Sequence, residues 1–378
     1  LYSDGTLLAT HADLEDDEQT VYIPEIHTTA KDQTTKINHT EANKTATIVD
    51  TVSYTNLLPG REYTVSGTLM DKETGKTVLA DGKEITASTT FTPEKSEGSV
   101  DVIFTFDASI VAPKTVVAFE TLTYKKIQIA VHADIEDKDQ TVYIPTIRTS
   151  AKDNVTGINH TEADKEVTIT DTVTYKGLEV GREYTVSGTL MNQRTGAKIL
   201  VNGKPVTAST TFTAEEKEGS VEVVFTFDAT ALEGTTTVVF ETLYTENKEV
   251  AAHTDINDKG QTIYIPKIRT TAISDDTNDH VTKADEKITL IDTVAFTSLE
   301  VGREYTVTVK LMDRAANKPI LVDGKEVTAQ TTFVPETTDG TVDVTFTFDG
   351  TGLEDTVIVV FETLYTEKKE VAVHADIT

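Results

Sequence analysis

Apolar and polar residues alternate along most of the chain, as they do in β-strands that bury one face. Clear examples are the segments 61–71 (REYTVSGTLMD), 206–213 (VTASTTFT), 219–228 (GSVEVVFTFD) and 356–364 (TVIVVFETL). These segments are rich in Val, Ile, Thr, Tyr and Phe, which favour strands, and no segment shows a convincing helical period. The pattern therefore predicts an all-β protein.

Turn residues separate the predicted strands at short intervals. Gly or Asn-Gly occurs within 58–61 (LPGR), 80–83 (ADGK), 201–204 (VNGK) and 322–325 (VDGK), where a tight turn requires a positive φ. About seven to nine short strands then fall within each domain-sized stretch, and this number favours an antiparallel β-sandwich of immunoglobulin-like character.

The same succession of strands and polar residues recurs at a fixed interval of 121 residues. Such an interval indicates tandem copies of one domain. We assign the copies to 23–143, 144–264 and 265–378, after a segment 1–22 that aligns with the closing strand of a further copy. The recurring positions are Thr28, Thr149 and Thr270; Asp50, Asp171 and Asp292; Glu120, Glu241 and Glu362; His132, His253 and His374; and the glutamines Gln19, Gln140 and Gln261.

The segments that join the copies, 141–150 and 262–271, each contain one Pro and no run of Gly and Ser. Linkers of this composition are stiff, so we expect the copies to form a rod. The chain has no cysteine and cannot stiffen its domains with disulfides. It shows no run of about 18 apolar residues that would predict a transmembrane helix, and no signal peptide or anchoring segment is visible.

Charge and motif content exclude several classes of function. The chain has 34 Lys and Arg against 63 Asp and Glu, a formal charge of −29, which disfavours nucleic acid and anionic membrane surfaces as partners. Acidic segments such as 134–140 (DIEDKDQ) lack the spacing of a calcium-binding loop, so we interpret them as solvated turns and expect no metal and no cofactor. No motif of a turnover enzyme is present, including GxSxG, HExxH and the P-loop.

Four of the recurring polar residues lie on the apolar face of their predicted strands, because side chains alternate between the two faces of a strand. The adjacent Thr29 lies on the polar face instead, so the inward Thr28 is the reactive candidate. The apolar neighbours on the same face are Ile26 and Ala30 for Thr28, Ile48 and Val52 for Asp50, Ala118 and Leu122 for Glu120, and Val142 and Ile144 for Gln140.

Buried carboxyl groups without a cation suggest chemistry. Two that face each other share a proton, and the pKa of one is strongly raised. A protonated carboxyl can donate to an amide carbonyl and make its carbon electrophilic, and a nearby threonine hydroxyl can attack that carbon. A histidine can act as base or acid. The product is an ester between Thr Oγ and Gln Cδ, with loss of ammonia, and it requires the groups to be pre-positioned away from water.

These motifs resemble the Thr–Gln ester-bond domains of Gram-positive surface adhesins, which are also described by their VaFE motif. The similarity rests on 117–122 (VAFETL), on the spacing from His132 to Gln140 and on the DTVSY segment that begins after Val49. It implies immunoglobulin-like (CnaB-like) sandwiches. It also implies that the first-strand Thr is esterified to the last-strand Gln, promoted by the Asp, Glu and His.

By this resemblance, the bonds and their assisting groups can be assigned copy by copy. Thr28 pairs with Gln140, assisted by Asp50, Glu120 and His132; Thr149 pairs with Gln261, assisted by Asp171, Glu241 and His253; and Thr270, Asp292, Glu362 and His374 form a site whose glutamine would lie beyond Thr378.

The resemblance thus implies the structural stalk of a bacterial cell-surface adhesin that is extracellular, anchored to the cell wall and cross-linked in a single turnover. Its expected partners are the neighbouring repeats. A host-ligand-binding module stays open as an alternative, with an unknown ligand. A Lys–Asn isopeptide domain would need an inward Lys and a closing Asn, and neither recurs. A further hypothesis is head-to-tail assembly of identical chains, in which Gln19 of one copy serves Thr270 of the next.

Overall fold

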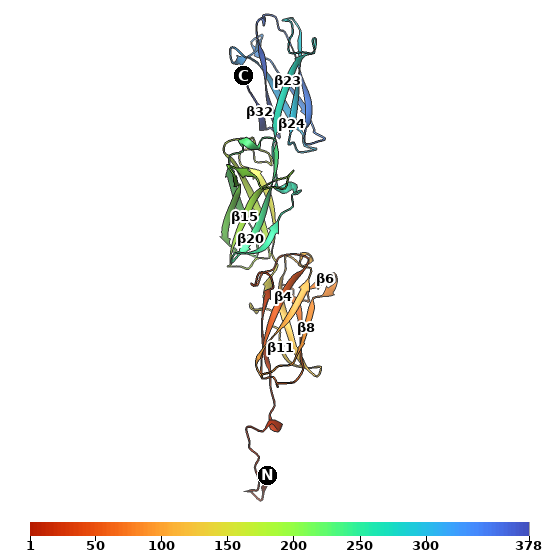
Figure 1. Ribbon diagram of the computed structural model, residues 1–378, viewed down its shortest axis with the longest axis vertical. Helices are drawn as coiled ribbons and strands as arrows, with labels where there is room; N and C mark the ends of the chain where they lie inside the picture. The colour runs from red at the N-terminus through yellow and green to blue at the C-terminus, as the bar shows by residue number, and fades with distance from the viewer. Residues whose placement is uncertain (378) are drawn as a thin grey trace. The chain divides into compact units, whose positions relative to one another are not determined.

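The alternating segments form the strands of antiparallel β-sandwiches in a computed structural model that describes residues 1–377 (Figure 1). This confirms the all-β prediction. Two compact units, Leu1–Thr146 and Ile147–Thr378, are distinguished, and each is considered by itself. Within residues 1–377, the helical elements are short 3-10 turns, and none is long and apolar enough to cross a membrane.

The first repeat has two sheets that face each other. The order β3-β4-β9 makes one sheet, and β11-β10-β5-β8 makes the other, with β12 also paired to β10. A small hairpin, β6-β7, lies outside them. The elements are β3 (Glu25–Asp32), β4 (Ala46–Thr55), β5 (Tyr63–Asp71), β6 (Leu79–Ala80), β7 (Lys83–Glu84), β8 (Thr86–Phe91), β9 (Gly98–Phe106), η2 (Ala108–Ile110), β10 (Thr115–Tyr124), β11 (Ile127–His132) and β12 (Thr141–Tyr143).

The second and third repeats have the same two-sheet plan, β13-β14-β19 against β18-β15-β20-β21 and β23-β24-β30 against β25, β29, β31 and β32. Their elements are β13 (Thr146–Asp153), β14 (Val167–Lys176), β15 (Glu183–Asn192), β16 (Leu200–Val201), β17 (Lys204–Pro205), β18 (Thr207–Thr213), β19 (Glu218–Phe227), η3 (Thr230–Leu232), β20 (Thr235–Thr245), β21 (Lys248–His253), η4 (Lys259–Gln261), β22 (Thr262–Ile265), β23 (Lys267–Ser274), β24 (Ile288–Thr297), β25 (Tyr305–Asp313), β26 (Lys318–Pro319), β27 (Leu321–Val322), β28 (Lys325–Glu326), β29 (Thr328–Phe333), β30 (Gly340–Phe348), β31 (Ile358–Thr366) and β32 (Lys369–His374).

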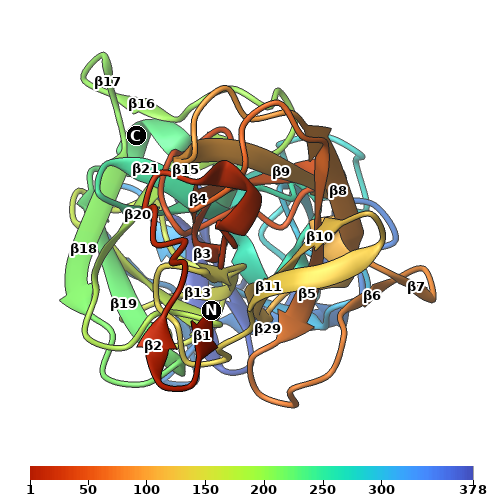
Figure 2. The ribbon, with the colours of Figure 1, turned by 90° about the horizontal axis from the view of Figure 1, so that it is seen from below.

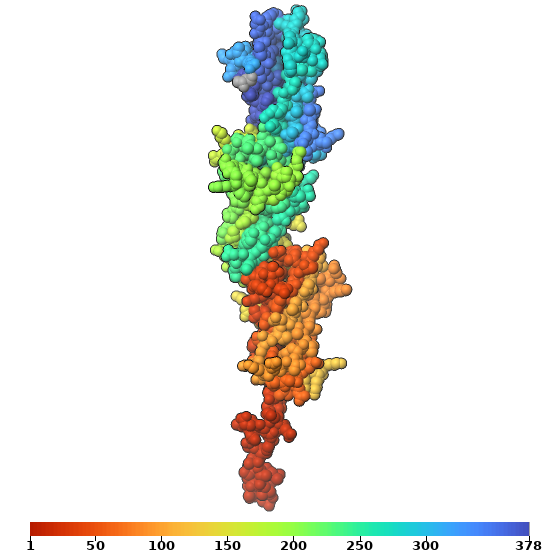
Figure 3. Space-filling model, viewed as in Figure 1, coloured from red at the N-terminus to blue at the C-terminus, as the bar shows by residue number. Residues whose placement is uncertain are grey.

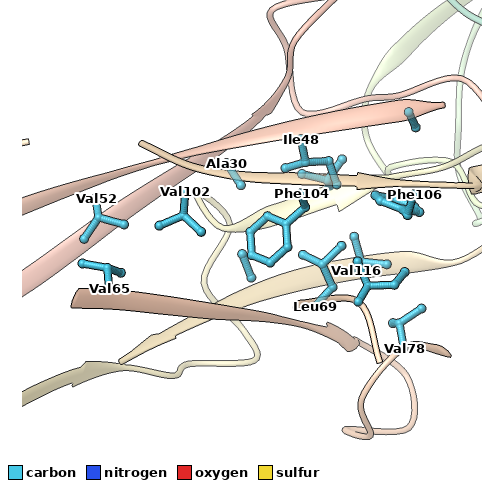
Figure 4. Packing of buried hydrophobic residues seen from close by; sticks show 14 of the residues in the cluster. Ala30, Ile48, Val52, Val65, Leu69, Val78, Val102, Phe104, Phe106 and Val116 are labelled. Atoms are coloured by element: carbon cyan, nitrogen blue, oxygen red, sulfur yellow. The ribbon is translucent and has the colours of Figure 1, made fainter. Parts of the chain in front are cut away.

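Alternation along the strands sends every second side chain into a dry core between the sheets. In the first repeat, Val52 and Val102 of one sheet point toward Val65 of the other, and Phe104 lies between the same layers (Figure 4). Gly67 leaves room for that ring, because a Cβ on Gly67 would lie 2.5 Å from Phe104 Cζ. The space between the sheets is therefore filled by apolar side chains.

The closing segment of each complete repeat returns to the strand that carries the glutamate. In the first repeat, β11 pairs with β10 from Glu120 to Tyr124, and after a turn β12 pairs with the other end of the same edge, from Thr115 to Val117. The turn between β11 and β12 ends at Gln140. The topology thus places the glutamine beside the strand that bears Glu120.

The segment before the first repeat, residues 1–22, is exposed except at Asp16, which is half-buried. It contains the hairpin of β1 (Tyr2–Ser3) and β2 (Thr6–Leu7), which Figure 2 shows near the N-terminus, and η1 (Asp17–Gln19). The space-filling view shows most of this red segment extending beyond the first repeat (Figure 3), and Tyr22 at its end lines a pocket with Tyr63 and Tyr124. The residues from Leu1 to Tyr22 therefore contribute nothing to that repeat's core.

Candidate cross-linking site

Thr28 lies on the inner side of β3, and its neighbour Thr29 is exposed. Thr28 is 6% exposed and pairs in register with Val52, while Ala30 pairs with Asp50. The strand alternation predicted from the sequence thus places one of the two hydroxyl groups inside the sandwich, next to the strand that carries the aspartate.

Gln140 lies between the first strand and the glutamate strand. The N–H of Ala30 donates to the carbonyl of Asp139 at 2.9 Å, and the N–H of Ala118 donates to the carbonyl of Gln140 at 3.1 Å. Backbone hydrogen bonds to both sides therefore fix where the glutamine side chain enters the core. That side chain is fully buried.

The amide of Gln140 contacts both the hydroxyl and an acid. Its Nε2 donates to Thr28 Oγ1 at 2.8 Å and to Glu120 Oε2 at 2.6 Å. Thr28 and Gln140 are 112 positions apart in the chain. The nucleophile and the amide expected to react therefore lie in hydrogen-bond contact at a dry position.

Asp50 and Glu120 form a buried acid pair beside that contact. Both are 0% exposed. Burial, and then the charge of Asp50, raise the pKa of Glu120 to about 10, and burial also raises the pKa of Asp50. Because two adjacent buried carboxylates cannot both ionise readily, the pair retains a proton at neutral pH. The site contains a neutral carboxylic acid within reach of the amide.

The second repeat has the same arrangement. Gln261 Nε2 donates to Thr149 Oγ1 at 2.9 Å and also to Glu241 Oε2, and Thr149 Oγ1 donates to Glu241 Oε2 at 3.3 Å. Burial, with Asp171 as the next cause, raises the pKa of Glu241 to about 11, and the pKa of Asp171 is raised by burial. Two complete sites of one geometry are therefore present.

The histidines of these two sites lie one strand away from the acids. His132 is the register partner of Glu120, and its Nε2 lies 2.8 Å from Asp137 Oδ2; His253 and Asp258 have the same contact at 2.8 Å. Burial acts to raise the pKa of Asp137, but the hydrogen bonds from His132 and backbone N–H groups lower it overall. In both repeats, the imidazole is hydrogen-bonded to this aspartate, and the His132 ring also packs edge-on against His27 with centroids 5.6 Å apart.

Sequence reasoning missed Asp137 and Asp258 as partners of the histidines, because it interpreted the acidic turns as solvated. Asp137 also accepts from the N–H of Asp139, so it shapes the turn that ends at the glutamine. A signal was present in the sequence, since an aspartate follows each histidine by five positions at His11, His132 and His253.

The third repeat brings its four recurring residues together. Thr270 Oγ1 donates to Asp292 Oδ1, and His374 Nδ1 lies 3.0 Å from Glu362 Oε2. Burial, and then Asp292, raise the pKa of Glu362 to about 9. The imidazole of this repeat thus contacts the glutamate directly.

Gln19 lies at the end of η1 on the exposed segment that precedes the first repeat. Its surroundings repeat the local structure found before Gln140: His11 Nε2 contacts Asp16 Oδ2, and Thr20 Oγ1 donates to the carbonyl of Asp16 at 2.9 Å. The segment therefore contains the same turn that precedes the closing strand of the first repeat. Gln19 itself is exposed in the described unit.

The donor set is suited to acid–base chemistry between side chains. No group of three or more His, Asp or Glu that could bind a metal ion occurs in residues 1–377. Each complete site consists of a hydroxyl, an amide and two acids. Such a set can exchange protons and transfer an acyl group.

Comparisons with known proteins identify the family. The family model described as "T-Q ester bond containing domain" matches residues 1–23, 24–144, 145–265 and 266–378. None of the curated proteins compared with the chain matches it.

Solved structures with some similarity include two crystal forms of a bacterial adhesin from Mobiluncus mulieris, described as containing intramolecular disulfide, isopeptide and ester bond cross-links. One is 15% identical and covers 66% of this chain and 87% of its own, with a TM-score of 0.28. The other is 14% identical and covers 74% and 93%, also with a TM-score of 0.28. Red sea bream transglutaminase is 11% identical over 62% of this chain and 31% of its own, with a TM-score of 0.21. Scores this low support no argument from shape, but the family match extends over the whole chain. The chain belongs to the family of T-Q ester bond containing domains.

Proposed function

We propose that each complete repeat joins its first and last strands by an ester between Thr Oγ and Gln Cδ, formed once by the protein itself. The observation that supports this most directly is the contact of Gln140 Nε2 with both Thr28 Oγ1 and the buried Glu120 carboxyl. A structural hydrogen bond alone would not require two acids with raised pKa values at the same buried position.

The first step activates the amide. Rotation of the Gln140 side-chain amide brings Oε1 to the place of Nε2, beside the carboxyl of Glu120. The protonated carboxyl then donates to Oε1 and makes Cδ electrophilic. Thr28 Oγ attacks Cδ, and the hydroxyl proton passes to the acid pair.

The second step releases ammonia. The tetrahedral intermediate collapses, the Cδ–N bond breaks, and the leaving nitrogen takes the proton from the acid pair as NH₃. One Cδ–Oγ bond forms for each Cδ–N bond that breaks, and no other reactant is consumed. We assign proton exchange with solvent to His132, since the equivalent His374 contacts Glu362 at 3.0 Å.

The position of the bond suggests a mechanical role. It would join β3, the first strand of a repeat, to the residue before β12, its last strand. A pulling force along the chain would then pass through the covalent link and bypass the hydrogen-bonded core. On this basis we propose that the chain is part of the stalk of a bacterial cell-surface adhesin, extracellular and anchored to the cell wall of a Gram-positive organism.

Intact-mass measurement tests the proposal directly. Each ester removes one ammonia, so the purified chain is expected to weigh about 34 Da less than its sequence mass. Substitution Thr28→Ala should restore about 17 Da of that deficit, because only the second repeat then reacts. Thr29→Ala is the matched control and should keep the full deficit. An intact mass equal to that of the unmodified sequence would refute ester formation in both repeats.

A second candidate function, assembly of identical chains, is favoured by the segment that contains Gln19. Residues 20–24 (TVYIP) repeat 141–145, which form β12 and the residues after it. Val142 is 1% exposed, whereas its equivalent Val21 is 83% exposed.

We propose that this segment of one copy can pair with β31 of another, which would bring Gln19 to Thr270. A denaturing gel of the concentrated chain is expected to show a ladder of multiples, and Gln19→Ala should abolish the ladder while leaving the deficit from the two internal esters. A single band for the unaltered chain would contradict covalent assembly.

A further inference from the structure

The loop that follows the threonine strand lies against the closing strand, β12 or β22, which comes directly after the reacting glutamine. We call it the bridging loop: residues 33–40 in the first repeat and 154–161 in the second. It begins where β3 or β13 ends and reaches the far side of the closing strand. The family chemistry described above assigns it no part.

In the first repeat, the bridging loop contacts the closing strand through three interactions. The N–H of Tyr143 donates to the carbonyl of Asn38 at 2.9 Å, and the N–H of Thr40 donates to the carbonyl of Tyr143 at 3.0 Å. The rings of His39 and Tyr143 stack with centroids 5.0 Å apart. Because β12 is only three residues long, these interactions form a substantial part of its attachment.

The same loop is anchored to the threonine strand by one buried carboxylate. Asp32, the last residue of β3, accepts at Oδ1 from the N–H groups of Thr34 and Thr35 at 2.8 and 2.7 Å, and at Oδ2 from Thr40 Oγ1 at 2.7 Å. Thr35 Oγ1 donates in turn to the carbonyl of His39 at 2.7 Å. A chain of hydrogen bonds therefore runs from β3 to the residue that stacks on β12.

The second repeat reproduces most of this construction, but Asp153 Oδ1 is buried without a hydrogen-bond partner, whereas Asp32 Oδ2 accepts from Thr40 Oγ1. Asp153 accepts from the N–H of Thr156 at 2.7 Å, and Thr156 Oγ1 donates to the carbonyl of His160 at 2.6 Å. The His160 ring stacks on Tyr264 at 4.8 Å. The N–H of Tyr264 donates to the carbonyl of Asn159 at 2.9 Å. The two repeats therefore share the ring stacking and the hydrogen bonds that lead from the aspartate through a threonine to the histidine carbonyl.

The third repeat shows that the sandwich itself does not need these side chains. Ser274 replaces the aspartate and Val281 replaces the histidine. Ser274 Oγ is buried without a hydrogen-bond partner, and Val281 is 70% exposed. The sheet is nevertheless formed, because β23 and β24 keep their register over eight pairs. The aspartate and the histidine of the bridging loop are therefore not required for the pairing of the first two strands, although the threonine bond is kept as Thr277 Oγ1 to the carbonyl of Val281.

The requirement it meets is the register of the closing strand. A slip of one residue would turn Gln140 away from the core, and a slip of two would move it by roughly 7 Å along β10. Ester formation depends on contact between the reacting groups, and a misplacement of about 1 Å can cost a factor of 10² in rate. A second attachment between the Thr28 strand and the Gln140 strand limits such slips.

We propose that the bridging loop positions the glutamine for ester formation, with Asp32 and Asp153 as the positioning residues. This inference rests on the proposed ester chemistry. The hydrogen bonds of the Thr28 and Gln140 side chains go to each other and to Glu120, and none goes to the bridging loop. It acts through Tyr143 or Tyr264, three residues beyond the reacting glutamine.

The test follows the rate of ammonia loss in each repeat. Chain made by cell-free synthesis is sampled over time, digested and analysed by mass for the Thr28–Gln140 and Thr149–Gln261 linked peptides. Asp32→Ser, which introduces the residue of the third repeat, is expected to slow linkage in the first repeat by about 10²-fold. The second repeat of the same molecule should react at its usual rate. Asp153→Ser should reverse the pattern.

Two further variants separate positioning from simple unfolding. Asp32→Asn keeps an acceptor oxygen for the loop N–H groups and is expected to restore most of the rate. Hydrogen exchange should show β4, β5 and β9 of the Asp32→Ser protein protected as in the parent. If Asp32→Ser fails to fold, His39→Val replaces it, since it removes the ring that stacks on Tyr143 and contacts Asn38, and it should also slow linkage.

The outcomes distinguish this inference from the proposed function. Normal linkage rates in folded Asp32→Ser, or in His39→Val where that variant is used, would overturn the positioning role and leave the ester chemistry standing. Absence of linked peptide from both repeats of the unaltered chain would instead refute the ester chemistry itself.

Discussion

Substitution Thr28→Ala is expected to lower the free energy of unfolding of the first repeat by about 4–5 kcal/mol, on the chain-entropy scale for closure of a loop of about 100 residues. The proposed link joins residues 112 positions apart, so it restricts almost the whole unfolded repeat. The methyl and hydroxyl groups lost with the substitution make a smaller contribution. Hydrogen exchange of the slowest amides in the first repeat under native conditions measures this change.

Two control variants show whether the covalent link is the cause. Thr28→Ser keeps the hydroxyl and should keep both the mass deficit and most of the stability. Thr29→Ala changes an exposed neighbour on the same strand and should have little effect. Equal loss of stability in Thr28→Ala and Thr28→Ser, with the mass deficit retained in Thr28→Ser, would mean that packing rather than the ester stabilises the repeat.

Without the ester, the first repeat is expected to lose stability steeply as the pH rises. Burial raises the pKa of Glu120 from 4.5 to about 10, so the folded state keeps a proton that the unfolded state loses above about pH 4.5. The stability that the folded state gains from holding this proton on Glu120 is complete below about pH 4.5 and is lost as the pH rises to about 10. At about 1.4 kcal/mol per pH unit for one proton, Thr28→Ala should lose about 4 kcal/mol between pH 6 and pH 9.

A matched variant isolates the acid pair from the general effect of the net charge of −29. Asp50→Asn with Glu120→Gln, made in the Thr28→Ala protein, removes both buried titrating groups and leaves the other charges in place. Its stability should depend only weakly on pH over the same range. Urea unfolding of the first repeat at several pH values gives the comparison. Parallel pH dependences in the two proteins would show that the pair ionises without difficulty in the folded state.

The sequence was most informative where a local rule applies. Strand alternation separates Thr28 from Thr29, and the structure buries the first and exposes the second. The turns at Asp81–Gly82 and Asn202–Gly203 have the positive φ angles that their residue types predict. Each of these results depends on steric preferences of a few adjacent residues, so a single sequence is enough to predict them.

Contacts between distant segments were harder to predict from the sequence. The partner of His132 is Asp137, although neighbouring Asp and Glu residues in the same acidic turn gave no reason to choose it. The stacking of His39 on Tyr143 joins segments about a hundred residues apart. Neither follows from alternation, because each depends on how a turn or a loop crosses the end of a strand.

By itself, the sequence determined the all-β class, the 121-residue interval and the inward direction of the threonine, glutamine and acids, since side-chain alternation and repetition are local or periodic properties. Only the tertiary structure decided that β12 pairs with the same edge of β10 as β11, which brings Gln140 to Thr28 and Glu120. Register between distant strands depends on the packing of the whole sandwich. Contact between reacting atoms is therefore a property of the folded repeat.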